Sequence, residues 1–228
     1  LLIWMSHPCW PSMVWQTYDY YFDPTAAYFG TKKACEPVHI QYNPLAEKVQ
    51  LVNISRKDFT SVEAYAEVLD IYGRRISADA CTTPLPVDTT LNVMDVRVPE
   101  GQDAYYLRLS LKADGEALSE NFYVRSAGDS GLKSLLSLPA AEVNVKTRFR
   151  KNDGTVTCNA LVTNDSDVPA MMVRLNLKGT NGEQILPAFY SDNYFHLMPG
   201  ESRTVEISYR NEDARGLRPV LETSWLND

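Results

Sequence analysis

Apolar and polar residues alternate with a period of two along most of the chain from Val38 onwards. The alternation is clearest over residues 62–68, 105–111, 173–177 and 205–209. Successive side chains of a β-strand point to opposite faces, so this pattern predicts strands with one buried face. Turn-forming residues interrupt the pattern about every 8–12 residues, a spacing typical of β-sandwiches. The sequence therefore predicts a mainly β fold.

The strand pattern is interrupted once, in a segment where Gly, Ser and Pro are frequent. We interpret residues 128–140 as a linker that contains a short helix at 132–136. The pattern on either side predicts two sandwiches of similar size, at residues 37–127 and 141–228. Each of these segments is long enough to bury a core of its own.

The first 36 residues follow a different pattern. Leu1–Met5 is a continuous apolar run, typical of a strand that is buried on both faces in a parallel sheet. Asp23 followed by Pro24 is a helix start signal and predicts a helix over residues 25–35. We interpret this segment as one terminal unit of an α/β fold and expect its helix to pack on the first sandwich. The strand would lack its neighbours here, so we expect it to pair with a sheet edge or to be covered by self-association.

Composition narrows the function classes. The net charge is −7, and no Lys/Arg cluster exceeds a pair, so nucleic acid is not expected as a partner. No apolar run reaches the ~18 residues of a membrane helix. The four cysteines form no C-x-x-C pair, so we expect free thiols and no metal site. Cys158 shares a strand face with apolar residues and is predicted to be a small buried core residue.

No complete set of catalytic residues emerges from the sequence. Glu63, Glu67 and Glu206 are predicted to lie on outward, solvated strand faces, and His39 is predicted to point outward too. Asp19 lies among aromatic residues, where a hydrogen-bonded structural role is favoured over that of a catalytic acid. A G-x-S-x-G elbow and a glycine-rich phosphate loop are both absent from the sequence. We therefore expect neither a cofactor nor a complete active site in this chain.

Three of the four tryptophans lie in the first 36 residues. Aromatic faces can stack on sugar rings, but such clusters more often provide packing. We assign packing to Trp15 and the nearby tyrosines. Trp4 and Trp10 bracket the carboxyl end of the predicted buried strand, where ligands bind in parallel α/β folds.

Two stretches resemble a known family. Residues 10–43, WPSMVWQTYDYYFDPTAAYFGTKKACEPVHIQYN, resemble the end of the catalytic barrel and the start of the next domain in glycoside hydrolase family 2. Residues 190–201, YSDNYFHLMPGE, resemble a motif in the last immunoglobulin-like domain of its exo-β-glucosaminidase and β-mannosidase branch. The resemblance implies two tandem immunoglobulin-like sandwiches behind a remnant of a (β/α)8 barrel at residues 1–36. It also implies that the catalytic glutamates lie earlier in the barrel, because no position here matches their motifs.

The resemblance further implies a partner and a set of binding residues. The loop after the last barrel strand borders the sugar site in this family, so Trp4, His7 and Trp10 are substrate-binding candidates. The family's W-x-L-N-N-A-W-P is replaced here by WMSHPCWP, so the resemblance leaves the substrate preference and the activity of the parent protein open. The partners implied are the rest of the same polypeptide, with its catalytic barrel, and through it a carbohydrate substrate. The family also implies a periplasmic or secreted location.

A second hypothesis comes from another class of function. The chain could be a carbohydrate-binding or adhesive β-sandwich module, which typically displays coplanar exposed aromatic rings. Tyr106, Tyr190 and Tyr194 are the candidates for such a platform.

Overall fold

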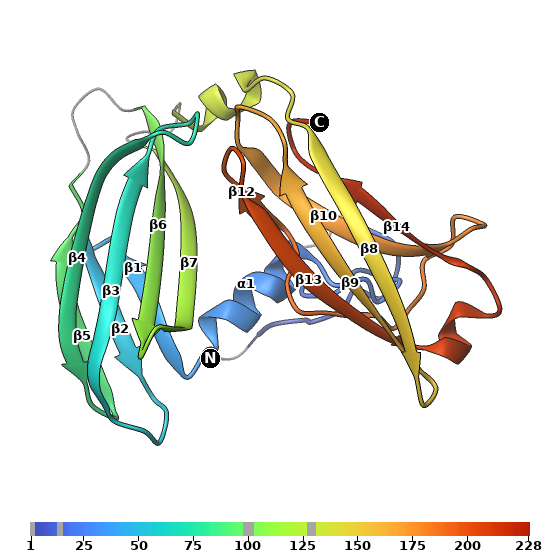
Figure 1. Cartoon of the computed structure of the whole chain (residues 1–228), viewed down its shortest axis with the longest axis horizontal. Helices are drawn as coiled ribbons and strands as arrows, with labels where there is room; N and C mark the ends of the chain where they lie inside the picture. The colour runs from blue at the N-terminus through green and yellow to red at the C-terminus, as the bar shows by residue number, and fades with distance from the viewer. Residues whose placement is uncertain (1–2, 13–15, 98–102, 127–130) are drawn as a thin grey trace. The chain divides into compact units, whose positions relative to one another are not determined.

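The computed structural model describes residues 3–12, 16–97, 103–126 and 131–228. The fold is mainly β, as the alternating pattern predicts (Figure 1). The chain divides into two compact units. The first unit is Lys33–Leu138, and the second unit combines Leu1–Lys32 with Pro139–Asp228. The second unit therefore includes most of the predicted barrel remnant.

The first unit is a sandwich of two antiparallel sheets, with strand orders β1-β2-β5 and β4-β3-β6-β7. Its strands are β1 (Val38–Asn43), β2 (Lys48–Asn53), β3 (Phe59–Leu69), β4 (Arg75–Leu85), β5 (Thr89–Asp95), β6 (Ala104–Ala113) and β7 (Glu116–Ser126). The predicted short helix is present as a 3-10 helix, η1 (Gly131–Ser137). Val62, Leu107 and Leu109 are fully buried in the core, so the alternation predicted over residues 62–68 and 105–111 is confirmed at these positions.

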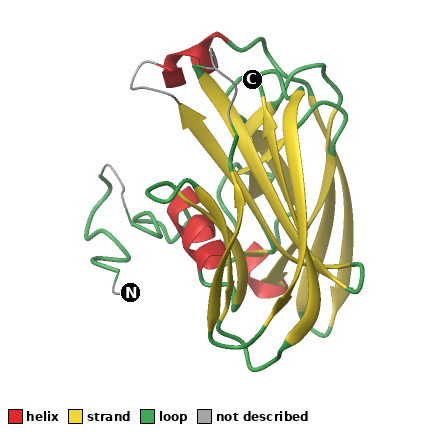
Figure 2. Cartoon of the chain, turned by 90° about the vertical axis from the view of Figure 1, so that its left-hand side faces the viewer, coloured by secondary structure: helices red, strands yellow, loops and turns green. Residues whose placement is uncertain are grey.

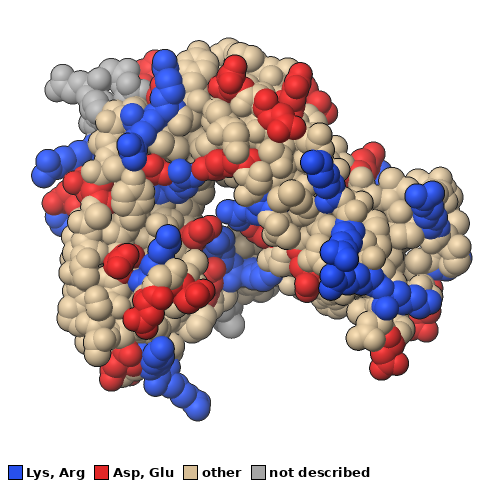
Figure 3. Space-filling model, viewed as in Figure 1, with Lys and Arg blue, Asp and Glu red and all other residues tan. Residues whose placement is uncertain are grey.

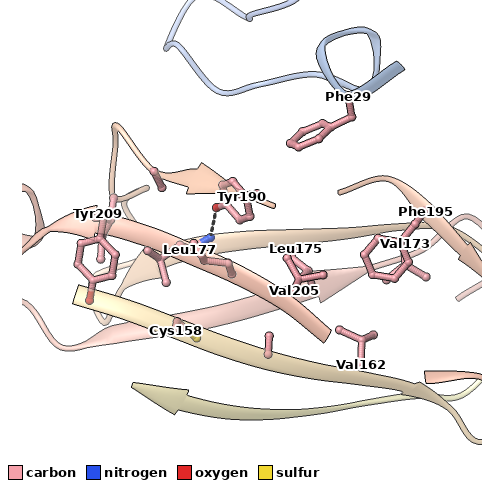
Figure 4. Packing of buried hydrophobic residues seen from close by; sticks show 14 of the residues in the cluster. Phe29, Cys158, Val162, Val173, Leu175, Leu177, Tyr190, Phe195, Val205 and Tyr209 are labelled. Carbon is pink, nitrogen blue, oxygen red and sulfur yellow. Dashed lines mark hydrogen bonds between the residues drawn. The ribbon is translucent and has the colours of Figure 1, made fainter. Parts of the chain in front are cut away.

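The second unit has strand orders β11-β13-β9-β8 and β12-β10-β14, again antiparallel. Its strands are β8 (Val143–Asn152), β9 (Thr155–Asn164), β10 (Ala170–Gly179), β11 (Phe189–Tyr190), β12 (Phe195–Leu197), β13 (Ser202–Arg210) and β14 (Pro219–Ser224), with a 3-10 turn, η2 (Asn211–Ala214), before the last strand. Cys158 is fully buried in its core, as predicted (Figure 4). Burial raises the pKa of the Cys158 thiol to about 11, so the thiolate form that reacts is disfavoured. The chain's cysteines are all unpaired.

The same arrangement of hydrogen bonds at the end of a strand, here called the corner, occurs once in each unit. Asn53 ends β2 and Asn164 ends β9, and both side chains are fully buried. Each Oδ1 accepts hydrogen bonds from the backbone N–H and the hydroxyl of the serine two residues later, Ser55 or Ser166. Each Nδ2 donates to the carbonyl of the residue four positions later and to a carbonyl in an edge strand of the opposite sheet, that of Leu85 in β4 or Leu197 in β12. The same hydrogen bonds at the same topological point indicate a common design for the two sandwiches.

A row of polar side chains on β7 covers the free edge of β1. Ser119, Asn121 and Tyr123, hereafter the side-chain row, lie on the inner face of β7, opposite leucines of β6. The backbone N–H of Ile40 donates to the Ser119 hydroxyl (3.3 Å), and the Asn121 amide donates to the carbonyl of Ile40 (3.2 Å). The N–H of Tyr42 donates to the Tyr123 hydroxyl (3.1 Å). Side chains thus satisfy backbone groups that a neighbouring strand would otherwise pair.

The prediction that His39 points into solvent is wrong, because the residue is only 6% exposed. Its Nε2 lies 3.3 Å from the Asn121 amide nitrogen, and its Nδ1 lies 3.2 Å from a carboxylate oxygen of Glu36. An acceptor role for Nε2 toward the amide would leave the proton on Nδ1, which then donates to Glu36. Alternation did not predict this burial because β7 covers β1 on the side that its own sheet leaves open.

The prediction that Glu67 is solvated is wrong too. Glu67 lies on the outer face of β3, directly across from Arg108 of β6. Its carboxylate pairs with the Arg108 guanidinium, and the Tyr65 hydroxyl donates to it at 3.4 Å. These neighbours leave Glu67 only 6% exposed. Glu63 and Glu206 are exposed, as predicted.

Candidate functional site

The predicted strand at Leu1–Met5 is not found in the described residues. Ile3–Met5 have no strand conformation, and Ile3, Trp4 and Met5 are 52%, 81% and 51% exposed. A strand needs neighbours to pair its backbone groups, and this stretch has none here. The expected pairing with a sheet edge is not seen over these three residues. The barrel-remnant interpretation therefore rests on the resemblance and not on the conformation of this stretch.

The three substrate-binding candidates lie in this part of the chain. Trp4 and Trp10 are both mostly exposed, at 81% and 67%. His7 is half-buried, and its ring stacks on Phe22 with a centroid distance of 4.3 Å and an interplanar angle of 12°. The His7 Nε2 also lies 3.2 Å from the carbonyl oxygen of Tyr20. Two exposed tryptophans therefore flank a histidine that is held in place. Trp15, for which we predict packing, lies outside the described residues.

Hydrogen bonds attach the loop of His7 to the following turn. The carbonyl of Ser6 accepts from the backbone N–H of Tyr18 (3.1 Å) and from the Thr17 hydroxyl (3.2 Å). The Asp19 carboxylate accepts from the N–H groups of Tyr21 (2.8 Å) and Asp23 (2.9 Å). The structural role predicted for Asp19 is confirmed by these bonds. Ser6, His7 and the turn at residues 17–23 form one connected substructure.

The helix that follows is α1 (Ala26–Ala34), the longest of the helices drawn in red in Figure 2. It packs on the second sandwich. Its Phe29 is 6% exposed and belongs to the core of the second unit, and Figure 4 shows it with Tyr190. The centroid of the Phe29 ring lies 6.5 Å from that of Tyr190 and 6.0 Å from that of Tyr194. Our expectation that this helix packs on the first sandwich is wrong. The reason is that α1 has one large buried side chain, and that side chain lies over the 190–201 motif, 161 or more positions later in the sequence.

Polar contacts reinforce this anchor. The Asp23 carboxylate pairs with the Arg174 guanidinium and accepts from the Gln184 side-chain amide (2.9 Å). Near the other end of the helix, the Lys32 ammonium donates to the carbonyl of Ser191 (2.7 Å). Asp23 is predicted to cap the helix, but α1 begins only at Ala26, and the carboxylate serves β10 and the segment after it instead.

The motif at residues 190–201 binds the backbone of β10 with its side chains. The Tyr190 hydroxyl accepts from the N–H of Leu177 (3.0 Å; Figure 4). Asn193 accepts from the N–H of Leu175 (2.8 Å) and donates to its carbonyl (2.9 Å). These bonds cover the part of β10 that the short strand β12 does not reach. The motif is therefore an edge-filling element and also the surface on which α1 lies.

His196, in the same motif, also bonds the backbone of β10 with its side chain. Its Nδ1 accepts from the N–H of Met172 (3.1 Å), at a bulge of β10 where Met172 has a φ of 53°. The pKa of His196 is lowered to about 4, mainly by burial and in addition by the nearby Arg203 guanidinium, while Asp192 acts in the opposite direction. His196 is therefore neutral at physiological pH and acts as a hydrogen-bond acceptor.

The aromatic platform of the second hypothesis is contradicted by burial. Tyr106 is fully buried, and its hydroxyl donates to the carbonyl of Ile71 (3.2 Å). Tyr190 is 7% exposed. Tyr194 is half-buried, with its ring 6.0 Å from that of Phe29 and the Arg174 guanidinium over its face. These three rings provide packing, and they do not form an exposed surface for stacking on sugars.

Charge and metal-binding groups add no further site among the described residues. Lys/Arg and Asp/Glu side chains are interspersed over the face shown in Figure 3. Within the described ranges, no three His, Cys, Asp or Glu side chains gather closely enough to hold a metal ion. The helices of the same ranges include none that is long and apolar enough to cross a membrane.

Comparison with known proteins identifies the region. Residues 121–227 match the family model of the exo-beta-D-glucosaminidase Ig-fold domain. The whole chain is 31% identical to an exo-beta-D-glucosaminidase of Arthroderma benhamiae, of which it spans 27%. It superposes on the crystal structure of the exo-chitosanase CsxA of Amycolatopsis orientalis with a TM-score of 0.87 and 26% identity, over 98% of this chain and 29% of that one. The chain matches the C-terminal portion of the exo-β-glucosaminidase and β-mannosidase branch of glycoside hydrolase family 2.

The match to this branch of glycoside hydrolase family 2 includes more distant relatives. A mannosylglycoprotein endo-beta-mannosidase of Lilium longiflorum is 24% identical over all of this chain, which spans 30% of its length. The chain thus spans about a quarter to a third of the length of the curated relatives that it matches. The predicted resemblance is confirmed.

Proposed function

We propose that this chain is the accessory region of a retaining, exo-acting β-glycosidase of the exo-β-glucosaminidase or β-mannosidase type. In this proposal residues 1–36 end the catalytic (β/α)8 barrel, and two immunoglobulin-like sandwiches at 37–127 and 141–228 support it. The observation that carries the proposal is the contrast within the N-terminal segment. Phe29 is buried in the second sandwich, whereas Trp4 and Trp10 are mostly exposed on a stretch without strand partners. The segment is thus attached to the second sandwich through Phe29 and exposes large aromatic side chains elsewhere. Such an exposed apolar surface is typical of one that another part of the polypeptide covers.

The exposed aromatic residues set the kind of contact that is expected. Tyr21 and Phe22 are 60% and 63% exposed, in the turn next to His7. A large aromatic side chain buries roughly 150–250 Å², so several of them together exceed the apolar patch of an ordinary monomer. We propose that the barrel covers part of this surface and that Trp4, His7 and Trp10 face the sugar site. Without the barrel, the same surface would drive self-association of the isolated chain.

Catalysis by this family type needs two carboxylates across the scissile bond. We propose that both are supplied by the barrel upstream, so the chain alone is inactive. A periplasmic or secreted location is proposed on the same family grounds.

Two assays test the proposal. Purified chain and the longer polypeptide are compared on nitrophenyl β-glucosaminide and β-mannoside. Turnover by the longer polypeptide alone is the expected result, and turnover by the isolated chain would overturn the assignment of the catalytic groups. In the active polypeptide, Trp4→Ala and Trp10→Ala are expected to raise KM. Phe189→Ala serves as the control, since Phe189 is 66% exposed on β11 and belongs to no proposed site.

A further inference from the structure

One ion pair links the second sandwich to the N-terminal segment. Arg174 projects from β10, and its guanidinium pairs with the Asp23 carboxylate, which also accepts from Gln184. The Asp23 side chain is only 13% exposed and that of Arg174 34%. A charge-assisted pair that is this well covered is stronger than an ordinary surface pair. The pair therefore fixes the position of Asp23 relative to β10.

The position of Asp23 in turn fixes a tight turn. Its backbone N–H donates to the Asp19 carboxylate (2.9 Å), and its carbonyl accepts from the N–H of Asp19 (3.1 Å). The N–H of Phe22 donates to the carbonyl of Asp19 (3.1 Å). Both ends of the turn are bonded to each other, so it moves as a unit with Asp23.

The turn carries the groups that hold His7. Phe22 stacks on the His7 ring, and the carbonyl of Tyr20 lies 3.2 Å from Nε2. Just before the turn, the N–H of Tyr18 donates to the carbonyl of Ser6. A continuous series of contacts therefore runs from Arg174 through Asp23 to the loop of Ser6 and His7.

We propose that Arg174 is a positioning residue for this loop, acting through Asp23 and the turn at residues 19–23. The last sandwich would thereby set the placement of His7, although Arg174 itself contacts neither His7 nor its neighbours in the loop. The consequence for sugar binding rests on the proposed function; the positioning itself does not.

Amide hydrogen exchange on the isolated chain tests the positioning. In Arg174→Met, exchange at the Tyr18 and Asp23 amides is expected to rise about tenfold or more, because a charge-assisted bond is lost. Exchange in β9 and β13 is expected to stay as in the wild type. Arg174→Lys keeps the charge without the planar fork and is expected to show a smaller rise. Asp23→Asn is expected to behave like Arg174→Met.

The control is Lys178→Met, which removes another ion pair of β10, with Glu222 of β14. It is expected to leave the Tyr18 and Asp23 amides unchanged. Equal exchange at these amides in folded Arg174→Met and wild-type protein would overturn the proposal. A uniform rise in all strands would also overturn it, because it would indicate general destabilisation in place of local positioning.

A second measurement uses the longer polypeptide. Arg174→Met is expected to raise KM for the preferred substrate about tenfold, with a smaller change in kcat, while Lys178→Met has no effect. An unchanged KM, together with faster exchange, would overturn the link to the sugar site. An inactive longer polypeptide would instead count against the proposed function, and the exchange experiment would still decide whether Arg174 positions the loop.

Discussion

Asn53 and Asn164 hold the same corner of their respective sandwiches with the same hydrogen bonds. Each side-chain amide is fully buried, and it bonds both the loop that follows its own strand and an edge strand of the opposite sheet. Both residues also begin an Asn-x-Ser sequence, the acceptor pattern for N-glycosylation. Their burial assigns this pattern a structural role in the folded protein.

Replacing either asparagine is expected to destabilise its own unit. Asn164→Ala leaves buried backbone groups without partners, which costs about 2–3 kcal/mol. Urea unfolding followed by fluorescence measures the loss. Asn144→Ala, at an exposed position of β8, is the control and is expected to change the free energy of unfolding by less than about 0.5 kcal/mol. Equal losses in the two variants would contradict the role of the corner.

Stability is expected to fall as the pH drops from about 6.5 to about 4, through His196. The folded state holds the pKa of His196 at about 4, whereas the unfolded chain protonates near 6.5. In this window the unfolded state binds more protons, so stability rises with pH, by at most about 3 kcal/mol in total. His196→Asn keeps an acceptor for the Met172 N–H and is expected to flatten the slope, measured by urea unfolding across the window. Asn144→Ala, at an exposed position of β8, changes no titratable group and is the control that is expected to keep the wild-type slope.

Phe29 is expected to contribute most of the attachment of α1. Phe29→Ala removes a buried ring and is expected to cost about 3–5 kcal/mol, unless the helix detaches. Detachment would appear as rapid proteolysis of residues 16–34 with the β-strands intact. Tyr21→Ala, at a ring that is 60% exposed, is expected to do neither. A stable, protected helix in Phe29→Ala would place the anchor elsewhere.

Limited proteolysis is expected to cut first between Ala127 and Ala141. Residues 127–130 of this window lie outside the described residues, and η1 occupies Gly131–Ser137. Two stable products that each unfold cooperatively would support separate folding of the two sandwiches. Preferential cleavage inside residues 45–120 or 150–220 would count against the proposed boundary.

The strands were predictable because alternation reports which face of a strand is buried. The same rule failed where a residue is covered by side chains that belong to other strands or loops. His39 lies under the side chains of β7, Glu67 under a cross-strand arginine, and Tyr106 is buried although it neighbours the inward Tyr105. Such coverage depends on contacts between residues that lie 35 to 82 positions apart, which a local pattern does not contain.

The candidate site was predictable in part. The sequence pointed to the N-terminal aromatic residues, but not to their anchor on residues 174–194, because that contact joins distant parts of the chain. The sequence also contains a repeated motif that predicts a structural feature common to the two sandwiches. Both sandwiches have Asn-x-Ser where a strand ends, VNIS at 52–55 and TNDS at 163–166, and this internal repeat indicates a shared corner.

The side-chain row of Ser119, Asn121 and Tyr123 has a consequence for how this sandwich can be reused. An exposed strand edge recruits other strands, which is how many β-domains polymerise. Here the N–H and carbonyl of Ile40 and the N–H of Tyr42, in the middle of the free edge of β1, are already bonded within the same unit. At this edge the first sandwich is therefore self-contained, and it can be inserted between other domains without templating fibres there. A sandwich whose edge does not recruit other strands is suited to an arrangement in which similar domains follow one another along the chain.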